Sequence, residues 1–202
     1  LSVNFGQADY DWAGMPDNSS NLEVAKLLYH CGVAVDMDYS PEGSGAFVGW
    51  GNPCAMSAME DHFGFLGSLD FVTKDDYSIS GWQNILKDEL DAGRPTVYRG
   101  YGPSGGHAFN MDGYDENDYF HFNWGWSGSY NGWFTVESLT PGSSSFSLGQ
   151  GAIIGLEPEN YHPAPAINGP LDGSTEVPAF PVEFSWIDQP GVDYYEVKID
   201  SN

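Results

Sequence analysis

The pattern of apolar positions predicts three helices in the first half of the chain. In three segments, apolar residues recur every three or four positions, which is the spacing of one helix face. The residues that carry this spacing are Leu22, Ala25 and Leu28; Met56, Met59 and Phe63; and Trp82, Ile85, Leu86 and Leu90. The predicted N-terminal caps are residues 17–20, Asn52 (with Pro53 at the first helical position) and Ser80, and the predicted ends are Gly32, Gly64 and Gly93.

After Pro95 the pattern changes to short apolar stretches that are divided by glycine, asparagine and aspartate. The predicted strands are residues 96–101, 107–114, 119–124, 132–136 and 151–156. The sequence Asp-Glu-Asn-Asp at 115–118 is typical of a hairpin turn between the second and the third of these strands. Helices that precede an antiparallel sheet indicate the α+β fold class.

The last part of the chain has a different composition. Repeated prolines predict a linker over residues 159–170. Beyond it, apolar residues alternate with polar ones at Val182, Phe184 and Trp186, and again at Tyr195, Val197 and Ile199. Two half-buried strands are too few to close a β-sandwich. The expected organisation is a main domain over 1–158, the linker, and an incomplete β-sandwich-like segment over 171–202.

Composition narrows the possible partners. The 202 residues include 29 acidic and 6 basic side chains, for a formal net charge of −23. Such a surface repels phosphate groups, which argues against nucleic acid and anionic membranes as partners. No run approaches the roughly 18 apolar residues of a membrane-spanning helix. The first four residues do not resemble a signal peptide, so any export signal is expected upstream of Leu1.

The strongest candidate for chemistry is His107. Gly105 and Gly106 precede it and allow a peptide to approach closely, and the neighbouring strand ends in Asn-Trp-Gly-Trp at 123–126. A histidine can accept and donate protons near neutral pH. A histidine in a strand pattern can also be a packing residue. The remaining histidines fit packing, helix-end or linker positions and are His30, His62, His121 and His162.

Several sequence segments together resemble the streptopain family of secreted, papain-like bacterial cysteine peptidases, from about Tyr10 to Pro158. The segments that carry the resemblance are residues 33–41 (VAVDMDYSP), 105–109 (GGHAF), 112–113 (DG), 120–128 (FHFNWGWSG), 132–134 (GWF) and 150–156 (QGAIIGL). The resemblance implies a papain-like α+β domain that is secreted, acts on proteins or peptides and needs no cofactor.

The same resemblance assigns roles to individual residues. It implies that His107 is the catalytic histidine, that Trp124 is the indole that shields or orients the imidazole, and that Asn123 is a possible amide partner. Papain-like enzymes differ in which of the last two meets the imidazole. The implied substrate-binding residues are Gly43, Ser44, Gly45, Ala46, Ser104, Gly105, Gly106 and Trp126. The family prefers a hydrophobic side chain in this pocket.

The resemblance also implies a nucleophile that this sequence does not contain. In the family, the cysteine opens a helix after a glutamine of the oxyanion hole, and both correspond to positions upstream of Leu1. We therefore expect an N-terminal fragment or segment to supply the cysteine, and the chain alone to be inactive. Cys54 is an alternative nucleophile because a helix N-terminus lowers the pKa of a thiol. Cys31 is expected to be a buried thiol.

Other interpretations of these features stay open. The chain could be a non-catalytic binding or adhesion module on a peptidase scaffold. The acidic residues Asp112, Asp115, Glu116 and Asp118 could bind calcium, although a hairpin turn accounts for them better and no other metal site is indicated. The indoles of Trp124, Trp126 and Trp133 could stack on a sugar. The glycine-rich residues 102–106 do not form a phosphate loop, because neither a lysine nor a helix follows.

Overall fold

The computed structural model describes residues 1–16, 18–159, 167–169 and 185–186. The chain divides into two units, Leu1–Glu159 and Asn160–Asn202. In the second unit, β9 (Ile167–Gly169) and β10 (Ser185–Trp186) form an antiparallel pair, which includes one of the predicted strand positions, Trp186. The remaining predicted strand positions and most of the predicted linker lie outside the described residues, so the three-part organisation stays a prediction.

The first unit contains the three predicted helices, with start sites that differ from the expected ones. They are α1 (Leu22–Ala34), α2 (Ala55–His62) and α3 (Ile79–Asp91). Each helix begins next to an extended residue whose side chain accepts a hydrogen bond from a backbone N–H of the first turn. The observed caps are Asn21, Cys54 and Ser78, in place of residues 17–20, Asn52 and Ser80. Pro53 therefore precedes α2 and is not its first residue.

Gly32 lies inside α1, where the sequence predicted the end of the helix. A Cβ atom at this position would lie 1.9 Å from the hydroxyl oxygen of Tyr39. A larger residue here would have to displace the end of the Tyr39 side chain, which comes from the following hairpin and crosses the helix closely. That hairpin consists of β1 (Asp38–Tyr39) and β2 (Ser44–Gly45), which pair in antiparallel register.

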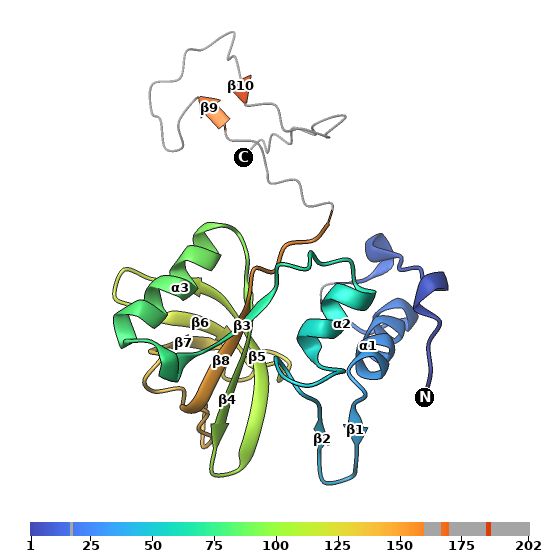
Figure 1. The fold of residues 1–202 in the computed structure, drawn as a ribbon, viewed down its shortest axis with the longest axis horizontal. Helices are drawn as coiled ribbons and strands as arrows, with labels where there is room; N and C mark the ends of the chain where they lie inside the picture. The colour runs from blue at the N-terminus through green and yellow to red at the C-terminus, as the bar shows by residue number, and fades with distance from the viewer. Residues whose placement is uncertain (17, 160–166, 170–184, 187–202) are drawn as a thin grey trace. The chain divides into compact units, whose positions relative to one another are not determined.

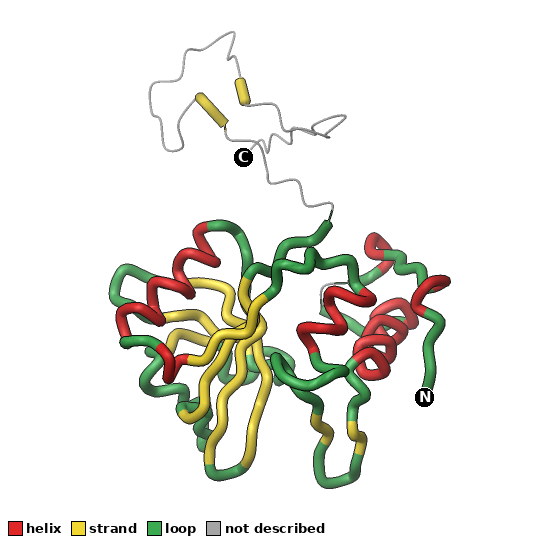
Figure 2. The backbone as a smooth tube through the Cα atoms, viewed as in Figure 1, coloured by secondary structure: helices red, strands yellow, loops and turns green. Residues whose placement is uncertain are grey.

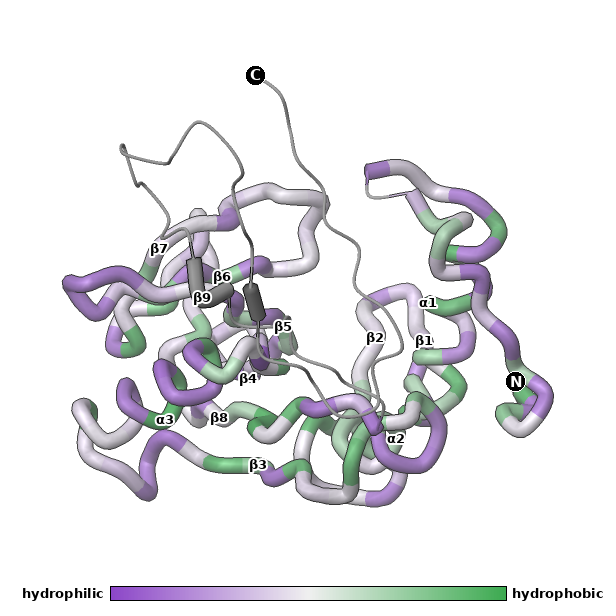
Figure 3. The backbone as a smooth tube through the Cα atoms, turned by 90° about the horizontal axis from the view of Figure 1, so that it is seen from above, coloured by the Kyte–Doolittle hydropathy of each residue, from purple (hydrophilic) through white to green (hydrophobic). Residues whose placement is uncertain are grey.

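A six-stranded antiparallel sheet forms the centre of this unit, with strand order β3-β8-β4-β5-β6-β7. The strands are β3 (Asp70–Thr73), β4 (Thr96–Gly102), β5 (Gly105–Tyr114), β6 (Phe120–Asn123), β7 (Gly132–Phe134) and β8 (Leu148–Ile154). The α+β class predicted from the sequence is confirmed. The short edge strand β3 was not predicted; it is the apolar segment labelled in Figure 3.

Both faces of the sheet are covered (Figures 1 and 2), with α3 on one side and α1, α2 and the small hairpin on the other. The core on the α3 side contains Trp82 and Leu86 of the helix, the aromatic residues Tyr98, Phe109, Phe120 and Phe122 of the sheet, and Trp124 just after β6. The core on the other side contains Val48, Leu69, Phe71 and Ile153, with Met56 and Met59 of α2 packed against it. Alternation along each strand separates the two cores.

One apolar face of α1 has no cover within this unit. Leu22 and Leu28 are 85% and 64% exposed, although they carry the helical spacing by which the helix was predicted. Fully burying a leucine side chain stabilises a protein by about 1.5–3 kcal/mol. Two leucines that stay in water do not contribute this stabilisation. Exposed apolar surface of this kind often marks a site that another segment or protein covers.

Candidate active site

His107 lies near the start of β5 and is held by a main-chain group of the next strand. The Nε2 atom of its imidazole is 2.8 Å from the carbonyl oxygen of Trp124. A carbonyl oxygen can only accept, so Nε2 must carry the proton and donate it. In the neutral imidazole the other nitrogen, Nδ1, then has the free lone pair. This is the tautomer that can take a proton from a thiol through Nδ1.

The side chain of Asn123 does not supply this partner. Its Oδ1 accepts a hydrogen bond from the backbone N–H of Gly125 at 3.0 Å. Asn123 therefore closes the tight turn that follows β6 and fixes the position of the Trp124 carbonyl. The sequence suggested the Asn123 amide as a partner of the imidazole, whereas in the structure this amide bonds to the Gly125 backbone.

The indole beside the imidazole belongs to Trp126 and not to Trp124. The rings of Trp126 and His107 are stacked, with centroids 5.0 Å apart and an interplanar angle of 23°. Trp124 is fully buried, and its indole N–H donates to the carbonyl oxygen of Tyr130 at 2.9 Å. Its role is structural: it fills the core between Phe109 and Phe146 and anchors the turn.

The turn that carries Trp126 is pinned at several points. The backbone N–H of Trp124 donates to Oδ1 of Asn131 at 3.0 Å. Gly125 has a φ of 73° and Gly128 one of 84°, in the left-handed region where glycine is not strained. The segment Asn-Trp-Gly-Trp-Ser-Gly therefore forms a well-defined turn. Its geometry places the Trp124 carbonyl beside the imidazole and the Trp126 indole over the face of the ring.

A second aromatic ring, which the sequence analysis did not single out, also lies against His107. The centroid of Phe146 is 5.1 Å from that of the imidazole. Its loop approaches β4 closely, since a Cβ atom on Gly100 would lie 2.0 Å from the carbonyl oxygen of Phe146. Gly100 pairs with His107 in the sheet register. The sequence held one signal of this close approach: Gly-Tyr-Gly at 100–102 places two glycines on one face of a strand.

Beside His107 lies a cavity of about 620 Å³. Four of the predicted substrate-binding residues line it, namely Ser44, Gly45, Ala46 and Gly106. The other four, Gly43, Ser104, Gly105 and Trp126, are not among its lining residues. Further lining residues that the sequence did not suggest are Leu28, Met37, Phe47, Arg99 and Tyr101. The β1–β2 hairpin and strands β4 and β5 thus form the walls of one pocket.

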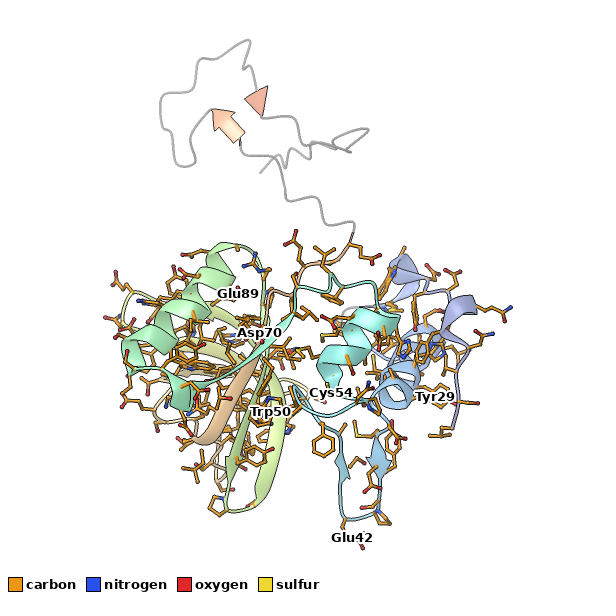
Figure 4. All side chains as sticks on the ribbon, viewed as in Figure 1. Tyr29, Glu42, Trp50, Cys54, Asp70 and Glu89 are labelled. Atoms are coloured by element: carbon orange, nitrogen blue, oxygen red, sulfur yellow. The ribbon has the colours of Figure 1, made fainter. Side chains whose placement is uncertain are left out.

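Neither thiol in this unit has the environment of a nucleophile. Cys54 caps α2 (Figure 4), but it is 1% exposed and its sulfur accepts from the backbone N–H of Ser57 at 3.5 Å. Cys31 lines the cavity, but burial raises the pKa of its thiol. Cys31 also lies in the last turn of α1, where the helix dipole disfavours a thiolate. The sequence expectation that Cys31 is buried is corrected to partly buried.

The acidic residues at 112–118 make local hydrogen bonds and ion pairs. Oδ1 of Asp115 accepts from the backbone N–H groups of Tyr119 and Asn117, each at 2.9 Å, and the first of these bonds contributes most to lowering the pKa of the carboxyl. Asp112 pairs with His121, and Asp118 pairs with Lys87. These contacts are those of a hairpin turn.

A family model described as Peptidase C10 matches residues 1–134. The chain belongs to the peptidase C10 family. Streptopain of Streptococcus pyogenes is 32% identical to it over 154 residues, which make up 73% of this chain and 38% of that protein. The thiol protease/hemagglutinin PrtT of Porphyromonas gingivalis is 34% identical over 180 residues, or 82% of this chain and 20% of that protein. The chain thus spans well under half the length of these relatives.

Solved structures of this family have the same fold. Active wild-type interpain A, a cysteine protease of Prevotella intermedia, aligns with a TM-score of 0.66 and 36% identity over 75% of this chain and 65% of that one. A fragment of prointerpain A from the same organism aligns with a TM-score of 0.63 over 76% of this chain and 50% of that one. The papain-like fold expected from the resemblance is confirmed. Among the described residues, every helix is too short or too polar to cross a bilayer.

Proposed function

We propose that this chain is the histidine-bearing part of a cysteine endopeptidase that acts on proteins or peptides outside the cell. In this proposal, a segment that is not part of the chain supplies the thiol nucleophile, and His107 acts as general base and general acid. The observation that carries the proposal is the hydrogen bond from Nε2 of His107 to the Trp124 carbonyl, because it orients the ring and leaves Nδ1 ready to take a proton.

The steps follow from this tautomer. Nδ1 takes the thiol proton, and the thiolate adds to the peptide carbonyl carbon. The imidazolium then returns the proton to the departing amine, the C–N bond breaks, and a thioester remains. A water molecule gives a proton to Nδ1 and adds to the thioester carbonyl, which releases the carboxylic acid and restores the thiol. Throughout, the Trp124 carbonyl accepts from Nε2–H and stabilises the cationic ring, while Trp126 covers its face.

Two observations favour a separate segment as the source of the cysteine. Cys54 is enclosed and Cys31 has a raised pKa, so neither thiol of the described unit suits the nucleophile. In addition, Leu22 and Leu28 leave an apolar face of α1 exposed, and Leu28 also lines the cavity beside His107. A cysteine-bearing segment that packs on this face would cover the leucines and bring its thiol toward the imidazole.

The decisive variant is His107→Ala in the complete protein, that is, this chain together with the segment that precedes it. Loss of the general base and acid is expected to reduce kcat/KM for peptide hydrolysis by about 10²- to 10⁴-fold. His121→Ala is the matched control, because His121 lies on the next strand and contacts Asp112 and Trp133 instead of the turn at Trp124. Its kcat/KM should stay close to that of the wild type.

Hydrolysis that persists in His107→Ala would contradict the assignment of His107 as general base and acid. Absence of hydrolysis in the complete wild-type protein would favour the alternative, a binding module on a peptidase scaffold.

A further inference from the structure

The peptide group between Trp124 and Gly125 is hydrogen-bonded at both ends. Its carbonyl oxygen accepts from Nε2 of His107 at 2.8 Å. Its N–H donates to Oδ1 of Asn123 at 3.0 Å. In a planar trans peptide group the N–H and the C=O point in opposite directions. The Asn123 amide, the peptide group and the imidazole therefore form one chain of hydrogen bonds, with the peptide group in the middle.

A second asparagine holds the preceding peptide group. The backbone N–H of Trp124 donates to Oδ1 of Asn131 at 3.0 Å. Two peptide groups meet at the Cα atom of Trp124, and a side-chain amide oxygen ties each of them. Because peptide groups are planar, only φ and ψ of Trp124 can turn them, and the two hydrogen bonds restrict both angles. The indole adds a third tie, since its N–H donates to the Tyr130 carbonyl oxygen at 2.9 Å.

The backbone of this turn needs such support. Besides the glycines, Ser127 and Tyr130 have positive φ angles of 51° and 62°. Residues with a side chain adopt this left-handed region at an energetic cost, and they stay there only when the surrounding structure holds them. The bonds to Asn123 and Asn131 are part of that structure. Strain of this kind is typical of sites that must present a group in one exact position.

The chain of hydrogen bonds affects the imidazole in two ways. A carbonyl that is fixed in direction selects the tautomer with the proton on Nε2 and orients the ring of His107. In addition, hydrogen bonds in a chain polarise one another, so the bond from Gly125 N–H to Asn123 makes the Trp124 carbonyl a stronger acceptor. A charged donor gains more from a strong acceptor than a neutral donor does. The support is therefore greatest when the ring is an imidazolium.

We propose that Asn123 and Asn131 are positioning residues that act on His107 through the main chain of Trp124. This inference rests on the proposed peptidase function. Neither side chain bonds to the imidazole; the peptide group between them and the ring transmits their effect. Asn123 sets the direction and the acceptor strength of the carbonyl, and Asn131 holds the residue that carries it.

The test replaces Asn123 by alanine and by aspartate in the complete protein. Asn123→Ala removes the acceptor of the Gly125 N–H, so kcat for peptide hydrolysis is expected to fall about 3- to 10-fold, the loss that corresponds to one hydrogen bond, with little change in KM. An aspartate oxygen also accepts from the N–H two residues further on, so Asn123→Asp should restore most of the kcat. Asn131→Ala and Asn131→Asp should differ in the same way.

Asn110→Ala is the matched control, and its kcat should stay close to that of the wild type. Asn110 lies opposite Asn123 in the sheet register and is exposed, and its side chain makes no hydrogen bond to any other described residue. Equal losses of kcat in the alanine and aspartate variants would show that no acceptor is needed and would overturn the proposal. If Asn123→Ala does not fold, the Asn131 pair of variants decides by the same criterion.

A second comparison places Asn123→Ala in a protein that already carries His107→Ala. A residue that acts only through the imidazole should not slow the residual hydrolysis any further. A purely structural role of Asn123 would lower the rate by the same factor with or without His107, and this result would also refute the inference.

The two proposals fail in different ways. If the complete wild-type protein hydrolyses no peptide, or if His107→Ala is as active as the wild type, the peptidase function fails. If the wild type is active, His107→Ala is not, and Asn123→Ala and Asn131→Ala both keep the full kcat, the function stands and the role of the two asparagines is refuted.

Discussion

At the scale of single residues, the imidazole of His107 is enclosed by three aromatic rings and one carbonyl oxygen. Trp126 stacks on one face, Phe146 and Phe109 border it, and the Trp124 carbonyl takes its Nε2 proton. An aromatic face stabilises a cation near it by about 0.5–2 kcal/mol. The three aromatic side chains therefore favour the imidazolium that forms in each half of the proposed reaction. They also limit the orientations that the imidazole can adopt.

Trp126→Ala tests this role. It should lower kcat of the complete enzyme by about tenfold with a smaller effect on KM, because the stacked ring acts on the imidazolium and not on the bound peptide. Trp126→Phe keeps an aromatic face and should recover most of the rate. The control is Trp133→Ala, since Trp133 packs on His121 and is 52% exposed. An equal loss in the phenylalanine and alanine variants would contradict a role for the aromatic face.

At the scale of elements, β4 positions the loop that carries Phe146. Gly100 and Gly102 leave no side chain on the face where residues 145 and 146 pass, and a Cβ at Gly102 would lie 1.7 Å from the Ser145 carbonyl oxygen. Behind them, a buried network joins α3 to the sheet: the indole of Trp82 donates to the Tyr98 hydroxyl, which donates to Gln150. Burial of Tyr98 raises the pKa of its hydroxyl, which stays a donor at all ordinary pH values.

Gly100→Ala should therefore displace the loop at Phe146. A Cβ placed 2.0 Å from a backbone oxygen forces a shift, and such overpacking costs about 1–3 kcal/mol of folding free energy. We expect a lower free energy of unfolding in urea and a reduced kcat in the complete enzyme. Gly67→Ala is the control, because nothing lies within 4 Å of a Cβ at that position. Unchanged stability and activity in Gly100→Ala would contradict the close approach.

The end of α3 is tied to the sheet by Glu89. Its carboxylate accepts two hydrogen bonds from Arg94, at 2.8 and 2.9 Å, and one from the backbone N–H of Gly155 at 2.8 Å. The bond from Arg94 is the main reason why the pKa of Glu89 is lowered. Stabilisation by Glu89 is then complete above the pKa of the unfolded chain, about 4.3, and is lost as the pH falls through the lower folded value.

Glu89→Gln should lower the free energy of unfolding by about 3 kcal/mol at neutral pH, because it removes the negative charge from the ion pair of Glu89 with Arg94 in a partly buried site. The difference from the wild type should shrink as the pH falls below about 4, where the wild-type carboxyl becomes protonated as well. Glu23→Gln, in the more exposed pair with Lys26, should cost about 0.5 kcal/mol or less. Urea titrations across pH measure both variants. A difference in unfolding free energy between Glu89→Gln and the wild type that stays constant down to low pH would refute the role of the ionised Glu89 carboxylate.

At the scale of the whole molecule, the described unit supplies one half of the proposed chemistry. The sheet presents the imidazole, Arg99 lines the cavity beside it, and Leu22 and Leu28 of α1 are exposed. The thiol of Cys54 has a structural role: it caps α2, although serine is a better capping residue than cysteine.

Cys54→Ser should accordingly leave the kcat/KM of the complete protein unchanged and keep or raise its melting temperature. The chain alone, with both thiols intact, should hydrolyse no peptide until the preceding segment is added. Peptide cleavage by the isolated chain that disappears in Cys54→Ser would place the nucleophile at Cys54 and contradict the proposed arrangement.

The sequence by itself determined the fold class, the three helices, five of the six sheet strands and the candidate histidine. These features depend on periodicity and on short motifs, and both are local. It missed β3, whose only apolar residues are the adjacent Phe71 and Val72, so the strand shows no alternation. It misplaced the helix caps because neighbouring polar residues compete for each one.

Only the tertiary structure decided which groups surround His107. Asn123, Trp124 and Trp126 are neighbours in sequence, but the turn with its positive φ angles sends an amide, a carbonyl and an indole to different places. Phe146 beside the imidazole and Arg99 on the opposite face of the sheet come from other elements, and no spacing links them to the histidine. Their chemistry arises from sheet register and close backbone approach, which depend on contacts between residues that are distant along the chain.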